Sequence, residues 1–533
     1  MHTLEKSLTS LAEDDRPLVD VLAPDGSVAR SYSYRRIVAA AAAVAADLRA
    51  YPVRPRDARP DGDPTDPAQL QVGVVTANGP EFLVADFAIL GAGGAEVVVP
   101  LAFTAEQAAS LLADIDVCLA DAAGVARLTE WGLEQVLPPD AQLRVLDIDR
   151  EPSGTDPLFP APTSPEADAG ERLCKIIHTS GTTSRPKGVC IREAALEELI
   201  RSLRTAMPDG AYRRYLSLVP MSLLIEQVTA VYLVVCDGGT LVLLPPEVPL
   251  VGTSSFAPRA VLPHIRAAQP TALVVTPALA EAMLTAAEAA RADRRDPVAA
   301  LFGRQEAPLV CCGGAPVDVD TLRRLDAHGI AVYEGYGLSE NSSVVSWNTP
   351  GARRLGSVGA PLAHVRVRTA PDGELLVKST SLFAGYKGGG DPSGCEVDED
   401  GWLHTGDLAD IEDGYIWIKG RKKSVIITAA GRNVAPEWVE AQYRSHPAVL
   451  AVAVVGDGLP ALHGLFLVDP RASLDTVRAE LDALGRDRLS DVERVEVAHL
   501  VPADETLHAE FFTVTGRPRR SAVLSAVTAG RFD

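Results

Sequence analysis

The most informative stretch of this sequence is the loop TSGTTSRPKG, which runs from Thr179 to Gly188. It follows a strand-like stretch at residues 174–178. Hydroxyls, glycines and one lysine on a tight loop after a strand suit a chain of phosphates, because backbone N–H groups and hydroxyls donate hydrogen bonds and the ammonium group supplies charge. No Gly-Lys-Ser/Thr follows Gly181 at the spacing of a Walker loop, so a different kind of phosphate loop is indicated. The alternative is a polar surface turn, and the candidate ligands are Lys187, Thr179, Ser180, Gly181, Thr182 and Thr183.

Segments on both sides of this loop alternate between strand-like and helix-like patterns. Helices are expected at residues 34–50 and 79–91. Further strand-like apolar runs occur at residues 72–77, 95–100, 117–121, 144–148, 216–219, 241–244, 272–275 and 309–312. Strands that alternate with helices at this spacing predict an α/β fold with a parallel sheet and crossover helices.

After about Gly356 the pattern changes to short β segments, some of them separated by Asp-Gly turns. These β segments are expected at residues 365–368, 374–378, 408–411 and 415–419. Later in the chain, helices are expected at 436–445 and 474–484, and strands at 449–455 and 464–468. We therefore predict a large domain at 1–420, a hinge at 421–424 and a small α+β domain at 425–533.

Composition limits the possible functions. A chain of 533 residues is too long for one ordinary core, which favours two or more domains. Its formal charge of −21 argues against a general nucleic-acid binder or a protein that binds anionic membranes. The seven cysteines are odd in number and form no CxxC pair, which predicts reduced, mostly buried thiols.

Two further features predict a cytoplasmic protein. Residues 1–16 are polar and acidic and contain no apolar core of a secretory signal. The longest apolar stretch, residues 228–246, is interrupted by Asp237, Gly238 and Gly239. That stretch is expected to form two buried strands, or a strand and a helix, instead of a membrane span.

Four more segments follow the phosphate loop in order: GGAP at residues 313–316, YEGYGLSE at 333–340, WLHTGDL at 402–408 and GRNVAPE at 431–437. Together they resemble the adenylate-forming superfamily, which includes acyl-CoA synthetases, nonribosomal-peptide adenylation domains and firefly luciferase. The usual loop in that family is T-S-G-T-T-G-x-P-K-G, whereas this chain has Ser184 where glycine is usual. The resemblance implies a large N-terminal domain with mixed sheets and crossover helices, followed by a small mobile C-terminal domain.

The resemblance also implies roles for individual residues in nucleotide binding. Tyr336 would stack on adenine, an aromatic plane against a purine. Ser339 would meet the α-phosphate, and Glu340 would hold Mg²⁺ through its carboxylate. Asp407 would accept hydrogen bonds from both ribose hydroxyls. The other implied nucleotide residues are the adenine-binding turn Gly314, Ala315 and Pro316, together with Glu334, Arg421 on the ribose and Lys423 at the hinge.

The same family resemblance assigns the second half-reaction to Gly431. Only glycine permits the close backbone approach that a pantetheine arm of coenzyme A would need to reach an acyl-adenylate. The form GRNVAPE looks most like fatty-acyl- and aryl-CoA ligases. The acyl pocket is expected to use Leu223, Leu224, Thr276, Ala278, Gly335 and Ser342, which indicate an apolar carboxylic acid. Leu223 stands where many such ligases have histidine or an aromatic residue.

A further departure from the family pattern lies near the C-terminus. A lysine near the C-terminus normally closes onto the site for adenylation, in a context such as T-x-T-x-K-x-R-R, but here that position is Arg517. No lysine follows Lys423 in the sequence, so a shift of register cannot supply one. Guanidinium is planar and diffuse and does not replace a compact ammonium charge, and Pro518 biases Arg517 towards extended backbone. Losing one oriented electrostatic contact to a transition state typically costs ~10²–10³ in rate.

The leading hypothesis is therefore an acyl-CoA ligase that joins CoA to an acyl-adenylate supplied by a separate adenylating ligase, as would fit natural-product biosynthesis. Its cofactors would be the AMP moiety of the adenylate (or ATP), coenzyme A, and Mg²⁺ if adenylation occurs. One alternative is a complete ATP-dependent ligase in which Arg517 does the work, since 42 of the 50 basic residues are arginine. A carrier protein in place of CoA is a related possibility. A different class of function is a non-catalytic adenylate-binding partner of an active ligase.

Overall fold

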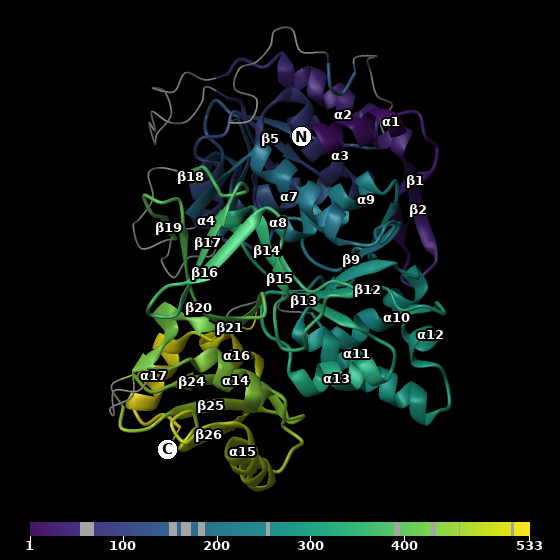
Figure 1. Cartoon of the computed structure of the whole chain (residues 1–533). Coiled ribbons are helices and arrows are strands. Elements are labelled where there is room, and N and C mark those ends of the chain that lie inside the picture. Colours follow the sequence, from purple (N-terminus) through teal and green to yellow (C-terminus); the bar gives the residue numbers. More distant parts are fainter. Residues whose placement is uncertain are drawn as a thin grey trace.

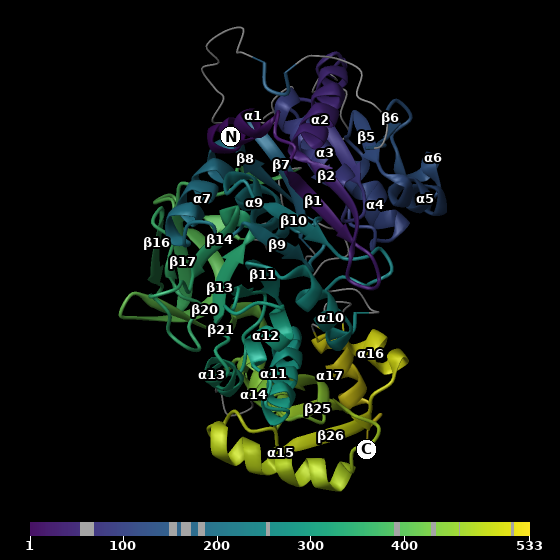
Figure 2. The same ribbon diagram turned by 90° about the vertical axis from the view of Figure 1, so that its right-hand side faces the viewer.

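The computed structural model describes residues 1–53, 69–148, 157–160, 172–179, 187–251, 256–387, 395–427, 433–457, 459–512, 516 and 518–532. For Thr179 and Lys187 it describes the backbone alone. Two lobes of unequal size make up the molecule (Figure 1). The described strands from β1 (Pro17–Leu22) to β21 (Tyr415–Arg421) form the large lobe, and those from β22 (Ile426–Ile427) onward lie in the small one. The amino terminus lies in the part of the large lobe away from the small lobe, which contains the carboxyl terminus (Figure 2).

The predicted combination of a large N-terminal domain and a small C-terminal domain is confirmed. Strand β21 ends at Arg421, and a 3₁₀ turn, Lys422–Ser424, follows it. This turn coincides with the predicted hinge, whose exact limits, like the mobility of the small domain, stay predictions.

The first sheet of the large lobe has seven strands in the described residues, in the order β18-β8-β7-β4-β3-β5-β6. From β7 to β6 the neighbouring strands run parallel, with α3 (Pro80–Ala92) and α4 (Ala105–Leu112) among the crossovers. Strands β8 and β18 are added antiparallel, so the sheet is mixed. The strand bounds are β3 (Gln71–Val75), β4 (Ala95–Val98), β5 (Val117–Ala120), β6 (Gln142–Val145), β7 (Leu173–Thr179), β8 (Lys187–Arg192) and β18 (Gly385–Tyr386), and α5 (Ala122–Trp131) and α6 (Leu133–Val136) precede β6.

The second sheet has nine strands in the part of the chain that is described, in the order β15-β14-β13-β12-β11-β9-β10-β1-β2. Its central neighbours from β13 to β1 are parallel, and both edges are antiparallel. Besides β1, its strands are β2 (Val28–Ser33), β9 (Arg214–Ser217), β10 (Thr240–Leu243), β11 (Ala272–Val275), β12 (Leu309–Cys312), β13 (Val332–Leu338), β14 (Ser343–Trp347) and β15 (Ala360–Pro361). The helices around the two sheets include α1 (His2–Leu11), α2 (Tyr34–Arg49), α7 (Glu193–Ala206), α10 (Pro258–Ala268), α11 (Pro277–Ala292), α12 (Pro297–Phe302) and α13 (Val319–Ala327).

The largest apolar core joins these two sheets. It contains buried aromatic side chains from several elements, among them Tyr34 of α2, Phe82 and Phe87 of α3, and Tyr232. Strand β3 is buried on both faces, which explains why its residues after Gln71 form a continuous apolar run instead of an alternating pattern.

The apolar stretch at 228–246 folds as helix and then strand, which is one of the two predicted outcomes. It follows α8 (Leu224–Glu226) and contributes to a π-helix η2 (Gln227–Tyr232), to α9 (Leu233–Cys236) and to β10. The chain turns at Gly238, whose φ of +58° suits glycine, and the carboxylate of Asp237 accepts a hydrogen bond from the Tyr212 N–H at 3.0 Å. None of the helices in the described ranges combines the length and apolar character that crossing a bilayer requires.

A third sheet forms the side of the large lobe that faces the small lobe (Figure 1). Its pairs are antiparallel among β16 (Val365–Thr369), β17 (Glu374–Ser379), β19 (Glu396–Val397), β20 (Leu403–Glu412) and β21. Asp413 and Gly414 connect β20 to β21 with positive φ values of 49° and 82°, as a tight hairpin requires. All seven cysteines are in described segments, and five of them are buried.

The small lobe is built on the sheet β24 (Val449–Val455), β25 (His463–Val468) and β26 (Val497–Pro502). Alternate residues of β24 enter different cores. Val452 and Val454 pack with helices α14 (Pro436–Arg444) and α15 (Leu474–Arg488), whereas Ala453 and Val455 pack with α16 (Glu505–Phe511) and α17 (Arg520–Thr528).

Candidate functional site

Asp407 lies at the centre of a polar cluster on the third sheet. Its carboxylate accepts a hydrogen bond from the Tyr336 hydroxyl at 2.5 Å and forms an ion pair with the Arg421 guanidinium, Nε to Oδ1 2.8 Å. Tyr336 comes from β13 of the nine-stranded sheet, whereas Asp407 and Arg421 are cross-strand partners on β20 and β21. The Asp407 side chain is 5% exposed and that of Arg421 is 54% exposed, so the carboxylate lies inside the cluster and the guanidinium at its rim.

Burial raises the pKa of Asp407, and the neighbouring Arg421 charge opposes that shift. Burial likewise raises the pKa of the Tyr336 hydroxyl well above its usual value. Behind Asp407, the Thr405 hydroxyl accepts from the Asp407 N–H at 3.1 Å and donates to the Leu375 carbonyl at 2.7 Å. The cluster therefore fixes a carboxylate beside an aromatic ring, which suits a ribose next to a purine.

Glu340 lies in a second polar cluster. It is in the 3₁₀ turn Ser339–Asn341 and is buried, and its Oε1 accepts a hydrogen bond from the Tyr386 hydroxyl at 2.6 Å. Tyr386 is on β18, and its hydroxyl also accepts from the Cys395 N–H at 3.1 Å. One anchored carboxylate can serve Mg²⁺ whose remaining ligands are phosphate oxygens and water. No cluster of three or more His, Cys, Asp or Glu side chains suited to a metal occurs among the described residues.

The turn Gly314, Ala315 and Pro316, which is predicted to bind adenine, is exposed. Gly314 has a φ of +84°, which favours glycine. The buried side chain of Glu334 anchors the residue that follows this turn, because its Oε1 accepts a hydrogen bond from the Val317 N–H at 3.2 Å. Burial raises the pKa of Glu334 to about 7, while the N–H groups of Val317 and Gly356 oppose the shift.

The ends of the predicted phosphate loop meet as cross-strand partners. Thr179 on β7 pairs with Lys187 on β8 in an antiparallel ladder. The loop residues Ser180, Gly181, Thr182 and Thr183 lie outside the described residues, as do Gly431 and Arg517. Lys423 is described and lies exposed in the turn after β21.

The predicted acyl-pocket residues differ in environment. Leu223 is 45% exposed at the start of α8, whereas Leu224 is buried. Thr276 is half-buried as the N-cap of α11, and Ala278, in the first turn of that helix, is exposed. Gly335 faces Trp347, because an added Cβ would lie 3.3 Å from that ring.

Ser342, also predicted for the acyl pocket, lies in the interior. It is fully buried, and its hydroxyl donates to the Ser381 carbonyl at 2.7 Å. Its φ is +53°, and its place in the predicted acyl pocket stays a prediction.

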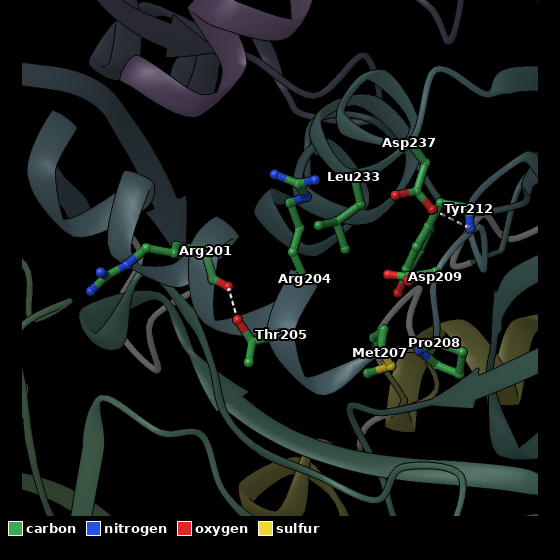
Figure 3. A pocket seen from close by; sticks show the side chains of 9 residues that line it. All are labelled: Arg201, Arg204, Thr205, Met207, Pro208, Asp209, Tyr212, Leu233 and Asp237. Atoms are coloured by element: carbon green, nitrogen blue, oxygen red, sulfur yellow. Dashed lines mark hydrogen bonds between the residues drawn. The ribbon is translucent and has the colours of Figure 1, made fainter.

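A cavity of about 230 Å³ lies elsewhere, between the end of α7 and the start of α9 (Figure 3). It contains none of the residues predicted for the site. Two arginines and two aspartates line it, so it offers no net charge that would select a nucleotide. Its lining is Arg201, Arg204, Thr205, Met207, Pro208, Asp209, Tyr212, Leu233 and Asp237.

Sequence reasoning did not identify several residues that organise the site. Tyr386 bonds Glu340, and Asn78 and Glu226 bond groups near the acyl-pocket segment. Glu226 carried a signal, since a carboxylate inside the apolar run after Leu223 needs a partner or a proton. Tyr386 and Asn78 carried none, because their partners are distant in sequence.

Comparisons with known proteins add to this geometry. Residues 12–387 match the family described as AMP-binding enzyme. The long-chain-fatty-acid–CoA ligase FadD15 of Mycobacterium bovis is 30% identical over 457 residues, covering 75% of this chain and 73% of that protein. The feruloyl-CoA synthase of an Amycolatopsis species is 29% identical over 440 residues, covering 80% of each. The solved structure of the anthranilate CoA ligase AuaEII with anthranoyl-AMP has a TM-score of 0.77 at 19% identity, covering 99% of this chain and 97% of that one.

The two mixed sheets and the small C-terminal domain match the fold of adenylate-forming enzymes. The chain belongs to the AMP-binding enzyme family. The prediction of an adenylate-forming enzyme of the acyl-CoA ligase type is thereby confirmed at the level of the family.

Proposed function

We propose that this enzyme forms an acyl-CoA thioester from an acyl-adenylate and CoA, and that its own ATP-dependent adenylation is weak or absent. The observation that carries the proposal is Arg517 at the position of the family's adenylation lysine, in a chain with no lysine after Lys423. The ammonium that would bridge the attacking carboxylate and the α-phosphate is therefore missing, while Gly431 for thiol attack is retained.

Three other cationic side chains of the C-terminal part of the chain are already bound to partners, so they are poorly placed to replace that ammonium. Arg520 is held inside the small lobe by Glu440 at 2.8 Å and Glu437 at 3.3 Å. Arg519 donates from Nε to the Phe512 carbonyl at 3.2 Å. Lys422 is paired with Asp372 at 2.6 Å. A guanidinium or ammonium that moved into the site would have to leave these partners, which supports a real loss of first-step chemistry.

Three groups of residues support binding of the nucleotide part of an adenylate. Asp407, beside Tyr336, would receive the ribose hydroxyls, and the exposed Gly314–Pro316 turn would cover the purine. Glu340, anchored by Tyr386, fits Mg²⁺ when the nucleotide is ATP, because it supplies one carboxylate and leaves the other ligands to phosphate and water. Bound Mg²⁺ would neutralise phosphate charge during adenylation.

The acyl group is proposed to be an apolar acid, because the exposed side chain at the start of α8 is Leu223. The names of the curated relatives support this class, since they include a long-chain fatty-acid ligase and a feruloyl-CoA synthase. We also propose that a separate ligase supplies the adenylate and that the enzyme is cytoplasmic.

The experiment compares the two half-reactions with purified protein. Dodecanoyl-adenylate or feruloyl-adenylate plus CoA should give acyl-CoA, whereas the corresponding acids with ATP and Mg²⁺ should give little pyrophosphate exchange. Rapid exchange by the protein alone would favour the alternative of a complete ligase that uses Arg517. Tight binding of the adenylates with no thioester formed from CoA would favour a non-catalytic binding partner. Thioester formed only on a carrier protein would show that the acyl acceptor is a carrier protein and not CoA.

A further inference from the structure

The segment between β9 and α8 is held in shape by side chains from both large sheets. Asn78, just after β3 of the seven-stranded sheet, donates from Nδ2 to the Val219 carbonyl at 2.8 Å and to the Ser217 hydroxyl at 3.1 Å. Its Oδ1 accepts from the Met221 N–H at 2.8 Å. Three bonds from one amide fix the path of the chain that leads to Leu223.

Two residues of the following helix hold the same segment from inside. Gln227 donates to the Met221 carbonyl at 2.8 Å. The N–H of Glu226 donates to the Leu223 carbonyl at 3.0 Å, so Glu226 is one turn from the exposed leucine. The segment from Ser217 to Leu223 is therefore fixed at its start, its middle and its end.

The side chain of Glu226 is completely buried among uncharged groups. Its Oε2 accepts from the Tyr215 hydroxyl at 3.0 Å, and that hydroxyl also lies 3.0 Å from the Thr229 hydroxyl. Its Oε1 is buried and has no hydrogen-bond partner within the described residues. A carboxylate with so few donors is poorly stabilised, whereas a neutral carboxylic acid fits such a place.

The electrostatics agree with a neutral acid. Burial raises the pKa of Glu226 to about 8, and the Ser217 and Tyr215 hydroxyls and the Val219 N–H oppose that shift only in part. The groups around the Glu226 carboxyl are Tyr215 and Ser217 of β9, Val219 of the segment and Thr229 of η2. In the described chain, none of these groups carries a charge.

We propose that Glu226 is a positioning residue for the acyl group: as a neutral acid it holds the segment from Ser217 to Leu223 in the shape that presents Leu223 to the acyl chain. When it ionises, the new buried charge attracts the Ser217 O–H and the Val219 N–H. This pull shifts the segment that Asn78 holds through the Ser217 oxygen and the Val219 carbonyl. Leu223 then shifts, and the acyl chain loses its apolar contact. This inference rests on the proposed function only in placing the acyl chain against Leu223.

The test measures binding instead of turnover. Calorimetry would give dissociation constants for AMP and for the non-reactive dodecanoyl-sulfamoyl adenosine, from about pH 6.5 to about pH 9.5. In the wild type the acyl analogue should lose about tenfold in affinity as pH rises through 8, while AMP changes little, because AMP carries no acyl group. Glu226→Gln, which keeps a neutral side chain of the same shape, should bind the analogue with no such pH dependence.

Tyr215→Phe is a second variant with a different signature. It removes a donor that favours the ionised form, so the loss of affinity should move to higher pH. It also carries the test if Glu226→Gln does not fold, as judged by its thermal transition. Glu247→Gln, at an exposed position, is the matched control and should follow the wild type.

The inference is overturned if wild type and Glu226→Gln show the same pH profile, if AMP and the analogue weaken together, or if the analogue binds no better than AMP at any pH. These outcomes are independent of the proposed loss of adenylation. Fast pyrophosphate exchange would end that proposal and leave the role of Glu226 standing.

Discussion

Asp407 and Arg421 face each other because of an irregularity in one hairpin. The turn at Asp413–Gly414 pairs Glu412 with Tyr415 and continues to Ala409 opposite Ile418. A β-bulge then shifts the register, so that Asp407 lies opposite Arg421 with the charged atoms 2.8 Å apart. Without the bulge Asp407 would lie opposite Gly420, and the carboxylate would lack its cation.

Arg517→Lys should restore part of the first half-reaction. We expect a gain of ~10²–10³ in ATP–pyrophosphate exchange, because a compact ammonium replaces a diffuse guanidinium at the α-phosphate. The rate from dodecanoyl-adenylate and CoA should change little. Arg471→Lys, a surface arginine with a side chain 90% exposed, is the control. An unchanged exchange rate in Arg517→Lys would mean that Arg517 already performs the step.

Asp407→Asn should weaken nucleotide binding. Loss of charge-assisted hydrogen bonds, typically worth about 1.5–3 kcal/mol, predicts a dissociation constant for AMP about 10- to 100-fold higher by calorimetry. Asp410→Asn, on the same strand and paired with Lys419 at 2.5 Å, should bind AMP as the wild type does. Equal affinity in Asp407→Asn and the wild type would remove Asp407 from the binding site.

Tyr386→Phe should affect ATP more than AMP. The hydroxyl anchors Glu340 at 2.6 Å, so its loss frees the proposed Mg²⁺ carboxylate while the ribose cluster stays intact. We expect about tenfold weaker ATP affinity in the presence of Mg²⁺, and little change for AMP or for ATP in EDTA. The control is Tyr415→Phe, and a uniform loss for every nucleotide would point to a general structural effect.

Lys175→Met should strongly destabilise the large lobe. The ammonium contacts Asp86 at 2.7 Å and also Glu96, and all three side chains are at most 1% exposed. Removing one partner leaves uncompensated buried charge and typically costs about 3–5 kcal/mol, seen as an earlier urea transition. Adding Asp86→Asn and Glu96→Gln should recover part of this loss. Lys419→Met, whose ion pair is exposed, should cost no more than about 1 kcal/mol.

Glu334 should make stability depend on pH. Burial raises its pKa from 4.5 to about 7 in the folded chain, so between these values the folded state binds a proton that the unfolded state has lost. The stabilisation is complete below 4.5 and disappears as pH rises through 7. The thermal midpoint of the wild type should therefore fall between about pH 5 and pH 8, and fall less in Glu334→Gln. The exposed variant Glu399→Gln is the control and should follow the wild type. The assignment is contradicted if the thermal midpoint of Glu334→Gln falls with pH as much as that of the control and the wild type.

Much of the fold could be predicted from sequence because many of its strands are apolar runs separated by helical stretches. The strand at Ala272–Val275 and the helix beginning near Tyr34 follow directly from these patterns. The stretch after Leu223 was harder, because a continuous apolar run fits a buried helix as well as a strand. The π-helix at Gln227–Tyr232 had no sequence signal.

By itself, the sequence determined the family, the order of the motifs and the arginine at the adenylation position, because these depend on residue types and spacing along one chain. Only the tertiary structure decided which of those residues meet: Tyr336 with Asp407, Tyr386 with Glu340, and Asn78 with the segment before Leu223. The physical reason is that such contacts join different sheets, and a bulge or a crossover sets them through packing over long separations. The charge state of Glu226 was also decided by the tertiary structure. The neighbours that bury its carboxyl group come together only when the chain folds.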